Sequence, residues 1–334
     1  MARYRGPFSN HFDGTKFFYP GFANAKNWLD ILRWQIGSEK QEWPDWVDDV
    51  APVVPLPLPE NLTARLTFVN HATFLIQTHQ GNFVTDPVWS KRASPFQWLG
   101  PARVRAPGIQ FESLPKIDFA LISHNHYDHM DEETIKRLKA AHDPIFFAGL
   151  GDGPYLKKYG VTKIQEMDWE QTVIQGPVKI TYEKSAHWSQ RSLNDTNESL
   201  WGSYILELPA IPSTTNRPHS SESRKIYFAG DTAYHSHFRE MAEKYGPMDV
   251  SLLPIGAYEP RWFMKGSHMN PDEAVQAHHD LQSQISIAMH FGTFQLTDEG
   301  LEAPTQAIER HYAKTPELRS RFLIQKFGQS FDLV

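Results

Sequence analysis

Three histidines and an aspartate are crowded into one short stretch of the chain, His124-x-His126-x-Asp128-His129. Imidazole and carboxylate groups are the ligands that zinc and its borderline neighbours prefer in proteins. Because His124 and His126 alternate, an extended loop would turn both side chains toward one ion. Asp128 and His129 are adjacent and point elsewhere, which favours a second ion close by. A solvated polar loop is the alternative, and the density of ligand-type residues argues against it.

The flanking residues indicate that this stretch follows a strand and precedes a helix. Residues 117–122 form a short apolar run that is typical of a buried strand. Asp131-Glu132-Glu133 is typical of a capped first helical turn, and we expect a helix from there to about Ala141. The cluster therefore lies in a strand-to-helix loop.

Further ligand-type residues occur singly along the chain. His187, Asp231 and His290 each follow a predicted buried strand at its C-terminal end. Any one of them alone is more often a packed or solvated residue than a ligand. Gly230 would let the backbone turn tightly beside an ion at Asp231. The order His, Asp, His behind the first cluster favours one shared site.

The His124-x-His126-x-Asp128-His129 pattern resembles the signature of the metallo-β-lactamase fold. The resemblance implies an α/β protein, a four-layer αββα sandwich that holds one or two metals at one edge. One metal would be held by His124, His126 and His187. The other would be held by Asp128, His129 and His290, and Asp231 would bridge the two. We expect two divalent ions, Zn in the first place, since a His/Asp set also accepts Mn or Fe.

Two such ions define the chemistry that we expect. A metal-bound water ionises near neutral pH, and a pair of ions can hold a hydroxide between them. That hydroxide would attack an electrophilic phosphorus or carbonyl centre, with Asp128 among the catalytic residues. Asp86 is a candidate acceptor for the second ring N–H of a ligand histidine. An ordinary Asp-Pro turn at Asp86 is an equal alternative.

Further segments between about Leu66 and Thr293 resemble the N-acylphosphatidylethanolamine phospholipase D branch of this fold. They are Asn70-His71-Ala72-Thr73, Asp86-Pro87-Val88, Ser185-Ala186-His187-Trp188, Gly230-Asp231-Thr232, residues 255–261, His268-Met269-Asn270-Pro271 and His290-Phe291-Gly292-Thr293. The resemblance implies hydrolysis of a phosphodiester: water enters at phosphorus, the N-acylethanolamine leaves and phosphatidic acid remains. A lactonase or ester hydrolase on the same metals is one alternative. A catalytically silent metal-binding interaction protein is the other.

Substrate contacts are expected from the same segments. His268 precedes a predicted helix start, where backbone N–H groups favour an anion. It would contact the phosphate or protonate the leaving group, unless it merely caps or packs. Tyr258 and Arg261 are further candidates for substrate binding, and Arg261 would neutralise a phosphate. Residues 262–264 would offer an apolar wall to an acyl chain, or else pack in the core.

The amino-acid composition excludes several classes of protein and of metal ligand. The 334 residues include no cysteine, so disulfides and thiolate ligands are excluded. A formal net charge of −6 argues against a nucleic-acid binder. No apolar run approaches the length of a membrane span, and the first twenty residues contain no apolar signal core. We therefore expect a cytoplasmic enzyme with a small-molecule or lipid phosphodiester substrate, and with peripheral membrane contact as an open alternative.

The chain is expected to comprise an N-terminal arm, residues 1–60, and a catalytic domain, residues 61–334. Within the arm, residues 24–37 have roughly helical apolar spacing, with Gly37 as a stop. Trp43, Trp46 and the proline-rich residues 52–59 follow. We expect this helix to pack on the body or on the second subunit of a homodimer, with at most its edge exposed. A lipid-facing surface is the alternative.

Apolar runs bounded by turn residues predict the remaining strands. They are residues 65–69, 73–78, 83–85, 144–148, 178–183, 199–208, 225–229, 250–254, 285–289 and 322–326. Helices are expected at 154–160 and 270–281, the second with Asn270 as N-cap and Pro271 in its first position. Residues 209–223 are polar and proline-rich, which indicates an exposed hairpin loop.

Overall fold

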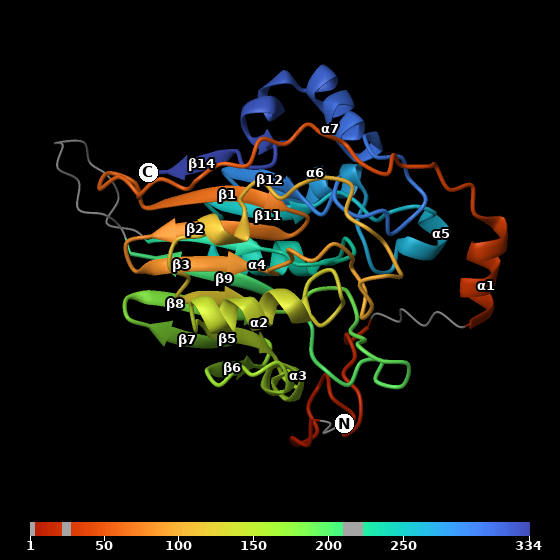
Figure 1. The fold of residues 1–334 in the computed structure, drawn as a ribbon, viewed down its shortest axis with the longest axis horizontal. Coiled ribbons are helices and arrows are strands. Elements are labelled where there is room, and N and C mark those ends of the chain that lie inside the picture. The colour runs from red at the N-terminus through yellow and green to blue at the C-terminus, as the bar shows by residue number, and fades with distance from the viewer. Residues whose placement is uncertain (1–3, 22–27, 210–222) are drawn as a thin grey trace.

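The computed structural model describes residues 4–21, 28–209 and 223–334. Two sheets of seven strands each lie face to face, with helices on both outer sides (Figure 1). This is the αββα sandwich that the sequence predicts. Within the described ranges, no helix combines the length and the apolarity needed to cross a bilayer.

The first sheet has the strand order β14-β1-β2-β3-β4-β5-β6. Its strands are β1 (Ala64–Asn70), β2 (Thr73–Thr78), β3 (Gly81–Thr85), β4 (Phe119–Leu121), β5 (Ile145–Gly149), β6 (Ile164–Met167) and β14 (Ser330–Leu333). Pairing is antiparallel from β14 to β3 and parallel from β3 to β6. Because β3 and β4 are parallel neighbours, Asp86 and the loop that begins at Ser123 leave the sheet side by side.

The second sheet has the order β13-β12-β11-β10-β9-β8-β7. Its strands are β7 (Gln171–Gln175), β8 (Val178–Glu183), β9 (Ser203–Leu208), β10 (Arg224–Phe228), β11 (Val250–Pro254), β12 (Ile285–Met289) and β13 (Phe322–Leu323). β9 is antiparallel to both β8 and β10, and β10 to β13 are parallel. β8, β10 and β12 therefore run in one direction. Their C-terminal ends, which lead to His187, Asp231 and His290, meet at one edge.

Strand β2 of the first sheet is buried on both faces, and its alternate residues enter different cores. Phe74 and Ile76 of β2 pack between the sheets, whereas Leu75 packs under the outer helices. Each such side chain contributes roughly 1.5–3 kcal/mol by leaving water. A slip of one residue would exchange the two faces, so the register of β2 is strongly specified.

Helices cover the outer face of each sheet. The helices are α1 (Trp28–Gly37), α2 (Glu132–Ala141), α3 (Gly153–Lys158), α4 (His237–Tyr245), α5 (Arg261–Met264), α6 (Pro271–Asp280) and α7 (Ala303–Lys314), with 3-10 turns at Phe111–Ser113 and Pro316–Ser320. Ile135 of α2 and Leu156 of α3 pack against the first sheet. Phe238 of α4 and Ile308 of α7 belong to the core of the second. Asn270 and Glu273 form the expected cap of α6, a reciprocal capping box.

Several elements differ from expectation. The predicted strand at 322–326 is only the two-residue β13, because the chain turns at Lys326, where Gln329 N donates to its carbonyl at 2.9 Å. It then crosses to the other sheet, where β14 pairs with β1. Asp131 precedes α2 but does not cap it; its carboxylate accepts hydrogen bonds from Ser90 and Thr134. β6, β7, β14, α4, α5 and α7 were not predicted. The expected loop lies almost entirely in residues 210–222, outside the described ranges.

The N-terminal segment, residues 4–21, packs on the body. Phe12 and Phe17 are each 1% exposed and belong to the larger apolar core of the protein. His11 Nε2 lies 2.8 Å from Asp168 Oδ1, in the loop between β6 and β7. This segment therefore belongs to the folded body in the same way as the strands do.

Helix α1 contacts the body differently from the prediction. Residues 24–27 of the predicted helix lie outside the described ranges, and α1 itself begins at Trp28. Leu29, Leu32 and Ile36 are 54%, 43% and 78% exposed, so these residues do not pack on the body, and their packing on a second subunit stays a prediction. The contact is made by Trp34, whose indole N–H lies 3.0 Å from both carboxylate oxygens of Asp298. This polar anchor turns Trp34 inward and leaves the leucines outside.

Candidate metal centre

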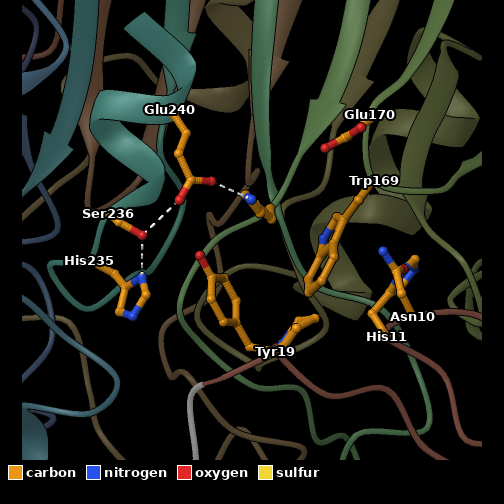
Figure 2. A pocket seen from close by; sticks show the side chains of 10 residues that line it. Asn10, His11, Tyr19, Trp169, Glu170, His235, Ser236 and Glu240 are labelled. Atoms are coloured by element: carbon orange, nitrogen blue, oxygen red, sulfur yellow. Dashed lines mark hydrogen bonds and ion pairs between the residues drawn. The ribbon is translucent and has the colours of Figure 1, made fainter. Parts of the chain in front are cut away.

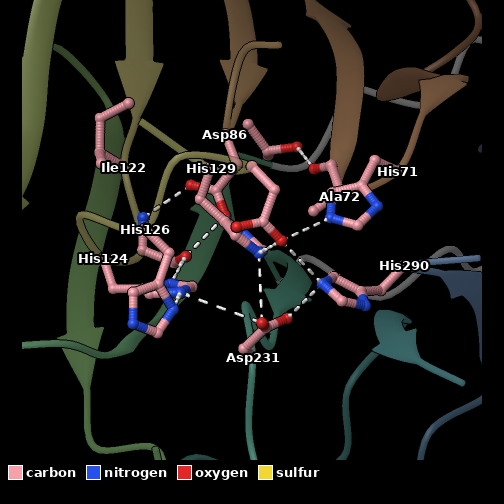
Figure 3. Close-up of polar contacts among 12 residues, drawn as sticks. His71, Ala72, Asp86, Ile122, His124, His126, His129, Asp231 and His290 are labelled. Carbon is pink, nitrogen blue, oxygen red and sulfur yellow. Dashed lines mark hydrogen bonds and ion pairs between the residues drawn. The ribbon is translucent and has the colours of Figure 1, made fainter. Parts of the chain in front are cut away.

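The predicted ligands converge at one edge of the sandwich, where the loops that follow β4, β8, β10 and β12 meet (Figure 3). Three of them form a histidine group. His124 Nε2 and His187 Nε2 lie 2.9 and 3.3 Å from His126 Nδ1. Zinc–nitrogen bonds of about 2.0–2.1 Å in a tetrahedral arrangement place ligand nitrogens roughly 3.3 Å apart. The spacing of these three nitrogens therefore fits one ion.

A second group surrounds the carboxylate of Asp128. Its Oδ2 lies 3.3 Å from His129 Nε2 and 3.5 Å from His290 Nε2. A third imidazole, that of His71, places Nε2 at 3.0 Å from the same oxygen. All three histidines are buried, with 0–2% of their surface exposed. This group matches the second predicted ligand set and adds one residue to it.

Asp231 lies between the two groups. Its Oδ2 is 3.2 Å from His129 Nε2 and 3.7 Å from His187 Nε2, and its Oδ1 is 3.1 Å from His290 Nε2. One carboxylate thus faces ligand atoms of both sets, as expected for a bridge. Gly230 makes the approach feasible: it has φ +57°, and a Cβ there would lie 2.6 Å from Cβ of Ser123.

The residues between the ligands hold the loop instead of entering the site. Asn125 Nδ2 donates to Asp152 Oδ1 at 3.1 Å, and its carbonyl accepts from Arg191. The hydroxyl of Tyr127 donates to the carbonyl of Arg191 at 2.7 Å, and the guanidinium lies over the Tyr127 ring at 3.8 Å. The side chains of His124 and His126 thus meet, as their spacing predicts, whereas those of Asn125 and Tyr127 bond to residues outside the ligand set.

Neighbouring acceptors orient the ligand imidazoles. Asp86 Oδ2 accepts from His129 Nδ1 at 2.6 Å, which turns Nε2 toward the site. His187 Nδ1 donates to the carbonyl of Ser267 at 2.8 Å with the same effect. Such contacts fix the tautomer of a metal-binding histidine. The predicted accepting role of Asp86 is thus supported by its geometry.

Charge within the site favours cation binding. Burial alone would lower the pKa of His129, but Asp231, Asp128 and Asp86 outweigh it and hold that pKa well above its usual value. The same balance raises the pKa of His290 to about 9. The carboxylates therefore retain protons on these imidazoles when no cation is bound, and a divalent ion would displace them. His129 Nε2, His290 Nε2 and Asp231 Oδ1 make no hydrogen bond within the described residues, which also fits an ion.

A cavity of about 470 Å³ opens onto this cluster. Its lining includes His126, Asp128, Asp231 and His268. Its apolar lining residues, called the apolar wall below, are Trp34, Trp188, Ala257, Phe263, Met264 and Leu296. Trp34 from the arm stacks on Phe263 with ring centroids 4.9 Å apart. Of the expected apolar wall at 262–264, Phe263 and Met264 line the cavity, whereas Trp262 is 51% exposed.

The predicted substrate residues divide into two kinds. His268 lines the cavity, with Nδ1 3.8 Å from Asp231 Oδ2. Tyr258 and Arg261 lie outside the lining. Arg261 instead pairs with Glu273 at 2.8 Å and donates to the carbonyl of His268 at 3.0 Å. In this structure the guanidinium holds the segment that carries His268.

Comparison with known proteins gives one decisive match. A family model described as "Beta-lactamase superfamily domain" matches residues 81–291, which contain every predicted metal ligand and the four strands that precede them, β4, β8, β10 and β12. The chain belongs to the beta-lactamase superfamily. Both the predicted family and the predicted sandwich are thereby confirmed.

Relatives within the superfamily carry hydrolase names. The chain is 38% identical over 241 residues to N-acyl-phosphatidylethanolamine-hydrolyzing phospholipase D 1 of Caenorhabditis elegans, a match that covers 69% of this chain and 64% of that protein. It is 33% identical over 232 residues to the mitochondrial N-acyl-phosphatidylethanolamine-hydrolyzing phospholipase D of Saccharomyces cerevisiae, covering 68% of this chain and 47% of that protein. The matches thus span less than two thirds of either relative.

A solved structure supports the architecture. Igni18, a metallo hydrolase from the archaeon Ignicoccus hospitalis, superposes with a TM-score of 0.57 and 17% identity, over 81% of this chain and 98% of that one. At this identity the likeness concerns the fold alone.

A second cavity, of about 220 Å³, has a different lining (Figure 2). The N-terminal segment closes it through His11 and Tyr19, and the start of α4 lies on its other side. Lys184 and Glu240 form an ion pair of 2.5 Å across it. None of the predicted metal ligands lines this cavity. The candidate active site of this superfamily member is therefore the larger cavity.

His71 is the site residue that sequence reasoning did not assign. It follows β1 and appears in the Asn70-His71-Ala72-Thr73 segment, which served only to narrow the resemblance. The available signal was its position: it is another histidine at the end of a buried strand. It differs from the assigned ligands in coming from the first antiparallel hairpin of the superfamily fold.

Proposed function

We propose that this chain is a dinuclear metal-dependent phosphodiesterase of the phospholipase D type. Its substrate would be N-acylated phosphatidylethanolamine or a closely related lipid phosphodiester. One observation carries the proposal: the 470 Å³ cavity joins an apolar wall directly to the His/Asp cluster. A phosphodiester with an acyl chain matches this arrangement, because its apolar chain would contact the wall while its phosphate reaches the cluster. The names of the worm and yeast relatives support the same substrate class.

The ligand atoms are proposed to hold two divalent ions, with Zn as the first choice. His124, His126 and His187 would hold one, Asp128, His129 and His290 the other, and Asp231 would bridge. When bound, such ions lower the pKa of a water molecule and offset negative charge on phosphate oxygens. The chain's own task is to orient these ligands, through Asp86 and the carbonyl of Ser267.

Two parts of the cavity would then contact the substrate. His268 lines the cavity beside Asp231 and would hold or deliver a proton at the leaving oxygen. Trp34, Phe263 and Met264 would contact the acyl chain of the leaving N-acylethanolamine. The products would be N-acylethanolamine and phosphatidic acid, with the oxygen of water on phosphorus.

A lactonase or ester hydrolase is the second candidate, favoured by one observation. The described residues that line the cavity include no lysine or arginine. The negative charge on the oxygens of a phosphodiester would have to be offset by the metals, by His268 and by the side-chain amides of Gln190 and Asn197. A neutral lactone would need less compensation of charge.

Purified, metal-loaded protein tests the choice between these candidates. N-acylphosphatidylethanolamine in mixed micelles and a lactone with an acyl chain of equal length are supplied in separate assays, with and without chelator. Reaction in ¹⁸O-water should place one heavy oxygen in phosphatidic acid and none in the N-acylethanolamine. Turnover of the lactone alone would overturn the phosphodiesterase proposal. Asp231→Asn serves as the inactive control on the same fold.

A further inference from the structure

His71 is fixed at the turn between β1 and β2 by its backbone as well as its side chain. Its φ of +46° lies in the left-handed region, which is uncommon for a residue with a side chain. Its N–H donates to Thr293 Oγ1 at 3.0 Å, and its carbonyl accepts from the N–H of His290 at 2.7 Å. These contacts hold the turn in a conformation that it would not favour alone. The same contacts join this turn to the segment that carries His290.

The His71 ring fills the space behind the second ligand group. It lies against the ring of His290, with centroids 3.9 Å apart, and edge-on to Phe294 at 5.3 Å. Nε2 lies 3.0 Å from Asp128 Oδ2, and Nδ1 is buried without a hydrogen-bond partner among the described residues. The Asp128 carboxylate can only accept a hydrogen bond, so this contact places an N–H of His71 on Nε2.

We propose that His71 is a positioning residue for the second metal. Its Nε2–H holds the carboxylate of Asp128, while its ring and backbone carbonyl hold His290, so that both ligands face the same point. The inference rests on the proposed metal centre and extends it with a residue from the first hairpin of the fold. Contacts of this kind typically contribute 10–100-fold to metal affinity.

The rival role is direct ligation. His71 Nε2 belongs with Asp128, His129 and His290 to a group whose potential ligand atoms all lie within 4.8 Å of one another. The two roles differ in what can replace the imidazole. A glutamine amide can donate N–H to Asp128, but it is a poor substitute for a nitrogen that binds zinc. A glutamine substitution therefore separates positioning from ligation.

The test compares wild type, His71→Ala and His71→Gln by zinc stoichiometry after equilibrium with graded chelator. His278→Gln is the matched control, because that histidine is also 1% exposed but bonds Ser286 in the second sheet. We expect wild type and His278→Gln to retain two ions. His71→Ala should retain one ion tightly and bind the second 10–100-fold more weakly, and His71→Gln should recover most of that loss.

Two results would overturn the inference. In one, His71→Ala binds both ions with wild-type affinity; in the other, His71→Gln is as impaired as His71→Ala, which would assign direct ligation. If His71→Ala does not fold, His71→Asn takes its place, since asparagine tolerates the left-handed conformation and is too short to reach Asp128 as histidine does. Failure of the proposed function gives a different pattern. The zinc results would stand while wild type left the phosphodiester uncleaved.

Discussion

Asp86 Oδ2 lies 2.6 Å from Nδ1 of His129, and both side chains are fully buried. The carboxylate also accepts from the backbone N–H and the hydroxyl of Ser123, at 2.7 and 2.5 Å. Asp86 therefore joins the end of β3 to the start of the metal loop. It fixes the direction in which His129 presents its second nitrogen.

Asp86→Asn should weaken binding of the second metal by about 10–100-fold, because the amide is a poorer acceptor for the ring N–H than the carboxylate. Competition with a chromophoric chelator would measure the change. Asp143→Asn is the control, since Asp143 also has positive φ but is paired at the surface with Lys163 at 2.8 Å. If Asp86→Asn and Asp143→Asn bind metal with equal affinity, Asp86 does not support metal binding.

Asp231→Asn should lose at least one equivalent of metal and lower turnover by more than about 100-fold. The substitution removes the one carboxylate that faces both ligand groups. Elemental analysis and steady-state kinetics on the same preparation would measure both effects. Retention of two tightly held ions would contradict the bridging role.

His268→Ala should lower turnover while leaving metal content intact, because His268 lies at the cavity and Asp231 remains in place. General acid catalysis typically contributes 10²–10⁴-fold. Phosphodiesters with acidic leaving groups need no such proton, so their hydrolysis should be affected least. An equal loss on good and poor leaving groups would instead assign phosphate binding to His268.

Trp34→Ala should raise KM for long-chain substrates by about tenfold or more and leave short-chain substrates nearly unchanged. The indole covers the cavity wall beside Phe263, and burial of an aromatic side chain against a ligand is worth roughly 1.5–3 kcal/mol. Trp46→Ala is the control within the same arm, because Trp46 is 52% exposed and does not line the cavity. A loss that does not depend on chain length would point to a general structural role for the arm.

Asp152→Asn should have little effect near pH 4 and should stabilise the protein increasingly as pH rises from there toward 8. Burial raises the pKa of Asp152 from 3.8 to about 8, so the folded chain keeps a proton that the unfolded chain releases. Between these pKa values the free energy of unfolding of wild type falls by about 1.4 kcal/mol per pH unit from this group. Asparagine keeps an acceptor for Asn125 and carries no such proton.

Urea unfolding of the metal-free wild type and Asp152→Asn, run in parallel from pH 5 to 8, would measure the difference between them. The gap in unfolding free energy should widen as pH rises. A gap that stays constant over this range would show that Asp152 is ionised in the folded protein.

Much of the site was predictable because its ligands follow a local rule. Each follows a short apolar run, and the HxHxDH spacing alternates ligands with anchors. The strands β11 and β12 were also predicted with their observed ends, since continuous apolar runs between polar turns leave little choice of boundary. Helix α4 was missed because only part of its short sequence is apolar, and β7 because its residues are mostly exposed at a sheet edge.

The sequence by itself determined the ligand types, the strand ends that carry them and the superfamily. Only the tertiary structure decided which nitrogens and oxygens meet, since those distances join residues as far apart as His71 and Asp128, or Trp34 and Asp298. It turned Arg261 toward Glu273, and it turned Trp34 into the cavity while leaving Leu32 in solvent. The physical reason is that periodicity records which side chains avoid water, whereas partners across the fold decide where polar groups point.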